Sequence, residues 1–429
     1  MSLSLCLMSL LLIPFAAAGL ALLQQGLGRS RSAAQTMLGS LCALATAAIV
    51  FVLVGSAWMG FAGGAAHVLH LGGRNLNWLG AEPLFAASIR GSLTAGLGRA
   101  LVLAFGMFAV GLCSLIPINA GSDRWRLAAV GAATALLAAI LFPLMAHWVW
   151  GGGWLAQLGP LFGPLSGLPG FTDMGGAGVI QVTGGLCALS VAWIVGPRQG
   201  KYTEGSAAAI PGHNIVQVLF GCMLALIGWI GLEAAAAMLF YSASLGQIAL
   251  TVINAVLASS AGCLAAVLTT RLRYRKPDAS LSANGWIAGL VAGSAGGGRL
   301  TPVEGILIAL VAGMLVTFLV ELLELRLLID DPGGAISVHL GAGLWGLLAY
   351  GLFAPATAPR AELLLSQLIG IATLVGLMFP VIHISHRLLN RVIPFRVDAD
   401  GDWQGMDIRE LGAGAYPEFV LHADEFTPR

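Results

Sequence analysis

The chain has 429 residues, of which 58% are hydrophobic and only 10% are charged, and its mean hydropathy is +0.88. Soluble proteins carry about 25% charged residues, so this composition excludes a soluble protein and indicates an integral membrane protein. The formal net charge of +1 argues against a nucleic-acid partner.

Apolar runs long enough to cross a bilayer recur along the chain. A spanning helix needs about 20 mostly apolar residues. The eighth run is the weakest of the eleven candidates, because it is short and rich in glycine. The predicted spans are 4–26, 37–62, 100–119, 127–150, 173–196, 214–237, 245–270, 281–298, 303–324, 333–354 and 362–386. The sequence therefore predicts an all-α integral membrane domain over residues 1–389 and a tail over residues 390–429.

Basic residues are distributed unevenly between the two sides of the predicted membrane domain. With the N-terminus outside, the inner segments contain 16 of the 21 Lys and Arg residues and the outer segments contain 5. Lys and Arg concentrate on the cytoplasmic side of membrane proteins. We therefore expect a multi-pass protein of the cell (inner) membrane with a cytoplasmic C-terminal tail.

One sequence pattern occurs in both the fifth and the tenth span. It reads DMGGAGVIQ at 173–181 and DPGGAISVH at 331–339, and Gly185 and Gly343 extend the match at the same spacing. The two spans cross the membrane in opposite directions. The pattern therefore indicates an inverted-topology repeat, with a functional site near the midplane where the halves meet.

Each copy of the repeat places a polar side chain eight residues after an Asp that can cap its helix. Eight helical residues cover about 12 Å. Two such depths, taken from opposite sides of an apolar core about 30 Å thick, nearly meet. We therefore expect Gln181 and His339 to face each other near the bilayer centre. Polar residues there either line a pathway or bond two helices together, and the matched depths favour the pathway.

Several motifs, in this order along the chain, resemble the ammonium transporter (Amt/Mep/Rh) family. They are GLALLQQGLGRS, AHWVWGGGWLAQLG, GPRQGKY followed by IPGHN, GWIGLE, DDPGGAISVHLGAG and GMDIRELGAGAY. The resemblance implies eleven helices, an inverted five-plus-five repeat plus a final helix, and a homotrimer with one pore per subunit. It further implies ammonium or ammonia as substrate, a lipid bilayer as surroundings and a PII-class signal protein as a partner at the cytoplasmic face.

The resemblance also implies roles for individual residues. Phe108 and Trp150 resemble aromatic residues of the outer vestibule, whose ring faces attract a cation by about 0.5–2 kcal/mol. Asp173 resembles an acidic residue beside that vestibule, and its alternative role is a helix cap. His339 resembles one member of a pair of pore histidines.

The chain departs from the family pattern at several of these positions. Gln181 replaces the first pore histidine, and Glu233 stands where the family has Asn. The second phenylalanine of the family's gate falls at about Leu219, next to Phe220, so both are predicted pore residues. The tail reads Leu-Gly-Ala at 411–413, where the family has His-Gly-Glu.

The sequence predicts transmembrane passage of ammonium or ammonia as the function. One alternative is an ammonium sensor or receptor that conducts weakly, and another is an Rh-like channel for a different small neutral molecule. The sequence has no nucleophile triad, phosphate loop or zinc-ligand spacing, so we expect no enzyme activity, no cofactor and no metal site.

Overall fold

The structure is a computed structural model that describes residues 3–87, 97–161, 167–203, 206–355 and 358–416. The loop predicted on the outer side between the fourth and fifth spans includes Ser166, which lies outside these described residues.

The first half of the chain forms five long helices that cross the bundle. These are α1 (Leu3–Leu27); α2 (Ala33–Val50) with η2 (Phe51–Gly55) and α3 (Ser56–Met59); α4 (Leu97–Gly121); α5 (Leu127–Leu136) with η4 (Leu137–Leu141) and α6 (Phe142–Val149); and η7 (Ala177–Val182) with α8 (Thr183–Val195).

The second half repeats this arrangement and adds a final helix. Its elements are α9 (Ile215–Tyr241); α10 (Leu245–Tyr274); α11 (Ala279–Gly293); α12 (Pro302–Glu321) with η9 (Leu322–Arg326); η10 (Ile336–Gly341) with α13 (Ala342–Phe353); and finally α14 (Arg360–Ala372) with η11 (Thr373–Met378) and α15 (Phe379–Val392).

The structure confirms the predicted fold class, with eleven membrane-domain helices among the described residues. Ten helical segments among the described residues are long and apolar enough to span a membrane. The eleventh is α11, which has 15 residues and corresponds to the weak eighth run of the sequence. It packs closely on α10, since a Cβ atom on Gly289 would lie 2.0 Å from the carbonyl oxygen of Ala258.

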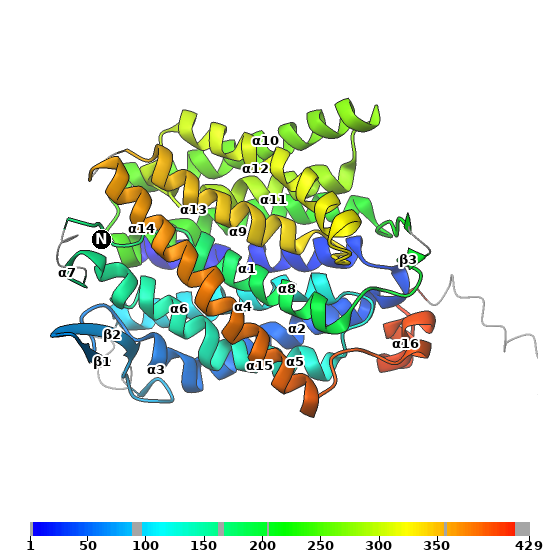
Figure 1. The fold of residues 1–429 in the computed structure, drawn as a ribbon, viewed down its shortest axis with the longest axis horizontal. Coiled ribbons are helices and arrows are strands. Elements are labelled where there is room, and N and C mark those ends of the chain that lie inside the picture. Colours follow the sequence, from blue (N-terminus) through cyan, green and yellow to red (C-terminus); the bar gives the residue numbers. More distant parts are fainter. Residues whose placement is uncertain (1–2, 88–96, 162–166, 204–205, 356–357, 417–429) are drawn as a thin grey trace, which may run out of the picture.

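Small connecting elements lie at the two ends of the bundle. One end carries the antiparallel hairpin of β1 (Ala66–Leu71) and β2 (Arg74–Gly80), with η5 (Trp154–Gln157) and α7 (Leu158–Leu161). The other carries β3 (Tyr202–Thr203), β4 (Ser206–Ala207), α16 (Ala399–Gln404) and η12 (Asp407–Leu411). Figure 1 shows these groups at opposite ends of the long helices, and we name them the hairpin face and the tail face.

Helices α1 and α9 approach closely because glycines line their contact. A Cβ atom on Gly228 would lie 1.9 Å from the backbone nitrogen of Ala16, and one on Gly19 would lie 2.5 Å from that of Ala225. Without a hydrophobic driving force between helices in lipid, such backbone approach is a main source of helix association. These two helices begin the two halves of the repeat, so the contact joins the halves along their length.

A buried ion cluster ties together the loops of the tail face. Asp330 accepts hydrogen bonds from the guanidinium of Arg198 at 2.9 Å, and Arg124 lies 3.7 Å from the same carboxylate. Burial of Asp330 opposes its ionisation, but the two arginines outweigh burial and hold the pKa of this carboxyl well below its usual range. The cluster therefore depends on an ionised Asp330.

Candidate functional site: the crossing of the two repeat helices

The two repeat helices begin with matching caps. Asp173 Oδ2 accepts hydrogen bonds from the backbone nitrogens of Gly178 and Val179, at 2.9 and 2.8 Å. The carboxylate of Asp331 accepts them from Ala335 and Ile336, at 3.0 and 2.7 Å. A carboxylate at a helix N-terminus satisfies unpaired amide groups and favours the positive end of the helix dipole.

Glycine makes the same backbone turn possible at both caps. Gly176 and Gly334, each three residues after the capping Asp, have φ values of 90° and 75°. A side chain with a Cβ atom is strained in this left-handed region, and glycine is not. The first turns that follow, η7 and η10, are π-helical, a form that occurs mostly as short segments at functional sites.

The predicted polar pair meets within these π-helical turns. His339 Nδ1 lies 2.7 Å from Gln181 Oε1, and both side chains are almost completely buried. An amide oxygen only accepts, so Nδ1 carries the imidazole proton and Nε2 is the acceptor nitrogen. The amide nitrogen of Gln181 has no hydrogen-bond partner among the described residues. The pair therefore offers donors from Gln181 and an acceptor from His339.

An aromatic cluster lies on the hairpin-face side of this pair. The rings of Trp150 and Phe240 stack with centroids 5.0 Å apart, and Phe105 packs edge-on against both, at 5.4 and 5.2 Å. Trp150 and Phe240 line a cavity of about 400 Å³ that also includes Phe61 and Arg99. The cluster thus forms the inner wall of a cavity near the hairpin face.

Asp173 connects the aromatic cluster to the repeat helix. Its backbone oxygen accepts hydrogen bonds from Trp150 Nε1 at 2.9 Å and from the hydroxyl of Tyr241 at 3.1 Å. Its side chain is fully buried, and Oδ1 has no partner among the described residues. Asp173 therefore positions Trp150 through its main chain while its carboxylate caps η7.

A second buried carboxyl group lies next to this loop. Glu233, on α9, accepts a hydrogen bond at 2.6 Å from the hydroxyl of Ser294, which in turn accepts one from Trp229 Nε1 at 2.8 Å. A Cβ atom on Gly175 would lie 2.8 Å from Glu233 Cγ. Glycine at 175 therefore allows Glu233 to pack directly against the backbone that follows Asp173.

Comparison with known proteins identifies the fold. The model of the Ammonium Transporter Family matches residues 4–416. The chain belongs to this family. Amt2, an ammonium transporter of Archaeoglobus fulgidus, is 32% identical over 96% of this chain and 88% of its own length. An ammonium transporter of Bacillus subtilis is 28% identical over 93% of this chain and 94% of its own.

Solved structures of the family have the same fold. A structure titled Sensor Amt Protein has a TM-score of 0.85 and 26% identity, covering 95% of this chain and 97% of that chain. The Mep2 structure of Candida albicans has a TM-score of 0.79 over 97% of this chain and 90% of that chain; at 22% identity this likeness concerns the fold alone.

The structure does not bring every family-derived candidate to the site. Phe108 is half-buried and lines an apolar groove with Ile13 and Pro14, whereas Phe105, one helical turn earlier, contacts Trp150. The structure therefore places Phe105, and not the predicted Phe108, against the aromatic cluster at the cavity.

Leu219 and Phe220 are also displaced from the expected pore. They are 43% and 54% exposed, on the surface of α9 that faces away from the bundle, near the start of this helix at the tail face. Leu232, two turns before Phe240 and next to Glu233, is the fully buried leucine of this helix. The gate expected at Leu219 and Phe220 does not lie with Gln181 and His339.

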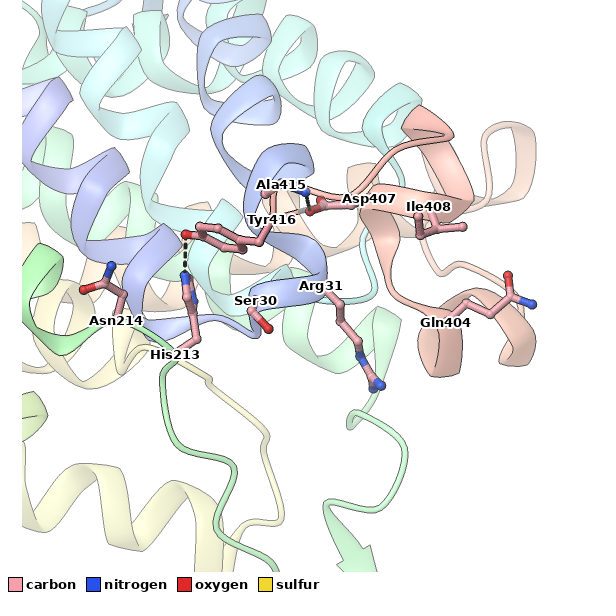
Figure 2. A pocket seen from close by; sticks show the side chains of 10 residues that line it. Ser30, Arg31, His213, Asn214, Gln404, Asp407, Ile408, Ala415 and Tyr416 are labelled. Carbon is pink, nitrogen blue, oxygen red and sulfur yellow. Dashed lines mark hydrogen bonds between the residues drawn. The ribbon is translucent and has the colours of Figure 1, made fainter. Parts of the chain in front are cut away.

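A second cavity, of about 530 Å³, lies at the tail face, where the tail meets the connections before α2 and α9. Figure 2 shows its lining, in which Tyr416 and His213 are joined by a 3.1 Å hydrogen bond and the backbone nitrogen of Ala415 bonds Asp407. Asp407 also accepts hydrogen bonds from the backbone nitrogens of Ala34 and Gln35, at 3.1 and 2.8 Å. The tail therefore binds the membrane domain through Asp407 and Tyr416, although it lacks the family's usual His-Gly-Glu.

Proposed function

We propose that the chain transports ammonium or ammonia through a pore in each subunit. The observation that carries this proposal is the Gln181–His339 pair, joined at 2.7 Å where the two inverted helices cross and placed below an aromatic cavity. Relatives named ammonium transporters over nearly the full length of the chain support the same substrate.

The aromatic cluster at the cavity is suited to capture of a small cation. The faces of Trp150 and Phe240 carry negative partial charge, and a cation over such a ring gains about 0.5–2 kcal/mol. Arg99 also lines the cavity and would repel a cation. Its guanidinium, however, lies over Phe61 and 3.9 Å from the carboxylate of Glu82, which reduces that repulsion.

The polar pair below the cavity is suited to ammonia rather than to the ion. Ammonia has one lone pair and three N–H groups, so it can accept a hydrogen bond from the free amide of Gln181 and donate one to His339 Nε2. Ammonium has no lone pair and would leave the Gln181 donors unpaired, which is costly in a buried site. The uncharged species is therefore the one that passes this point.

The transport function is tested with purified protein in lipid vesicles. Ammonium is added outside, and a pH-sensitive dye inside reports entry of ammonia as a rise in internal pH. We expect a faster, saturable rise than in protein-free vesicles of the same lipid. A rate equal to that of the empty vesicles would contradict transport.

One observation favours a second candidate function, an ammonium sensor that conducts weakly. The structure titled Sensor Amt Protein resembles this chain over almost its whole length. Saturable binding of ammonium to the purified protein, without flux in the vesicles, is the result expected of a sensor.

We also propose the orientation and assembly that the family resemblance implies. The tail face is cytoplasmic, in keeping with the 16 to 5 distribution of basic residues. The exposed apolar side chains at the start of α9, which include Leu219 and Phe220, suit contact with a second subunit in a homotrimer. Native mass spectrometry should therefore find three copies, and a monomer in mild detergent would contradict the assembly.

A PII-class signal protein at the cytoplasmic face is the remaining proposed partner. The described tail is bound to the membrane domain because Tyr416 bonds His213 and Asp407 accepts hydrogen bonds from the backbone nitrogens of Ala34 and Gln35. A surface for such a partner is therefore built mainly from the tail face. Titration of the purified transporter with the host's PII protein tests this, and absence of binding in every nucleotide state would remove it.

A further inference from the structure

Glu233 is a buried acid without a cationic partner. Its side chain is 3% exposed, and none of the ion pairs among the described residues includes it. Oε1 accepts a hydrogen bond from the hydroxyl of Ser294. A carboxylate at membrane depth is costly unless a cation or a proton neutralises it. We therefore expect Glu233 to bind either a cation or a proton.

The hydrogen bonds around Glu233 suit both protonation states. Ser294 Oγ lies 2.6 Å from Glu233 Oε1 and 2.8 Å from the carbonyl oxygen of Leu290, but its hydroxyl has a single proton. When Glu233 is ionised, this proton bonds the carboxylate. When Glu233 is protonated, the hydroxyl turns to Leu290 and accepts from the acid. Trp229 donates to Ser294 in either case.

Glu233 lies on α9 between the aromatic cluster and the tail-face end of that helix. Phe240 lies seven residues later on α9, which is two helical turns or about 10 Å along the same helix face. Gly175, against which Glu233 packs, lies between Asp173 and the η7 turn that carries Gln181. The acid is thus placed below the aromatic cluster and beside the start of the pore helix.

The charged and titratable groups around Glu233 come from neighbouring elements. Asp173 interacts with it electrostatically, and Tyr241 bonds the main chain of Asp173. Arg299 lies 5.3 Å from the centre of the Tyr241 ring and donates to the hydroxyl of Tyr350. Asp173 is thus a second buried carboxyl group near Glu233, and it lies on the side toward the cavity.

We propose that Glu233 takes the proton from ammonium before the nitrogen reaches Gln181, an inference that rests on the proposed transport function. One N–H bond of ammonium breaks, its electron pair stays on nitrogen as the lone pair of ammonia, and the proton bonds a carboxylate oxygen of Glu233. Ammonia continues to Gln181 and His339. The proton returns to the hairpin face by way of Asp173, whose Oδ1 is unpaired, so no net charge crosses.

The assignment predicts a distinctive pH profile. At fixed total ammonium and at pH values where the ion predominates, the wild type should transport at a nearly constant rate, because it deprotonates the ion itself. Glu233→Gln keeps a hydrogen bond to Ser294 but cannot take a proton. Its rate should follow the free ammonia and rise about tenfold per pH unit. Glu362→Gln, in the first turn of α14, is the matched control and should keep the wild-type profile.

Ser294 should act as a positioning residue in the same profile. Ser294→Ala removes the hydroxyl that serves both states and should give a pH profile between those of the wild type and Glu233→Gln. Ser294→Thr keeps a hydroxyl and should restore the flat profile. A Glu233→Gln protein with the flat wild-type profile would overturn the assignment.

Infrared difference spectroscopy separates failure of this assignment from failure of transport. In a sample alkaline enough to leave Glu233 ionised beforehand, adding ammonium to the wild type should produce the C=O stretch of a protonated carboxylic acid. This band should be absent in Glu233→Gln and shifted in Glu233→Asp. If the wild type shows no flux, the transport proposal fails while the band still decides the role of Glu233. Absence of an ammonium-dependent band in the wild type would overturn that role.

Discussion

The substitution Gln181→His introduces a proton relay at the centre of the pore. In the wild type, Gln181 Oε1 accepts from His339 Nδ1 at 2.7 Å, and an amide does not titrate in the physiological range. A second imidazole can take up and pass on a proton near neutral pH. The variant should therefore carry charge that the wild type does not.

The expected increase follows from the hydrogen bond that is replaced. A hydrogen bond to a charged group contributes about 1.5–3 kcal/mol. If a second imidazole lowers the barrier to proton transfer by that amount, the ammonium-dependent current should rise by about 10- to 150-fold. Gln and His are similar in volume, so the loss of stability should stay below about 1.5 kcal/mol even at this fully buried position.

The assay is the ammonium-induced current of vesicles on a solid-supported membrane, normalised to protein content. The matched control is the double exchange Gln181→His with His339→Gln, which keeps one imidazole and one amide and should return to the small wild-type current. A large, saturable wild-type current that Gln181→His leaves unchanged would refute the relay argument.

Three further predictions follow from the same structure. Trp150→Leu should raise the half-saturating ammonium concentration by about 2- to 30-fold through loss of a cation–π contact, as measured by flux, whereas Phe108→Leu in the apolar groove should leave it unchanged; an equal effect of both would contradict the geometry. In a cysteine-free background, a cysteine at Asn75 should react with an impermeant thiol reagent on intact cells and one at Trp403 should not; the opposite pattern would reverse the orientation. Asp330→Asn leaves the buried Arg124 without its carboxylate partner and leaves Arg198 with Asp123 alone, and it should lower stability by about 3–5 kcal/mol. Because the folded-state pKa of Asp330 lies below its unfolded value, its stabilisation is present above about pH 4 and is lost as the pH falls through the folded pKa, so the melting temperature should drop there in the wild type but not in the variant.

The features predicted best from the sequence were those with a period or an internal copy. Two matched segments placed Gln181 and His339 at equal depths, and the structure joins them directly. The helix count followed from the length of the apolar runs, including the short helix α11. Such features depend on the position of a residue along a helix, and this position follows directly from the residue number.

The rotation of a helix about its axis was much harder to predict. Helix α4 is apolar on all sides, so no hydrophobic face distinguishes Phe105 from Phe108, which differ by about 60° around a helix with 3.6 residues per turn. Helix α9 is likewise apolar on all sides, so the sequence does not show that Phe220 points away from the bundle. Ser294 gave no signal at all, because its role depends on Trp229 and Glu233, which lie more than 60 residues away.

Gln181 and His339 are proposed to pass ammonia and not the ammonium ion. The most direct test records internal pH and membrane current on the same wild-type vesicles during an inward ammonium gradient. We expect a saturable rise of internal pH with little accompanying current. A current that matches the nitrogen flux, one charge per ammonium, without the rise in internal pH would show that the ion itself crosses and would contradict passage of ammonia.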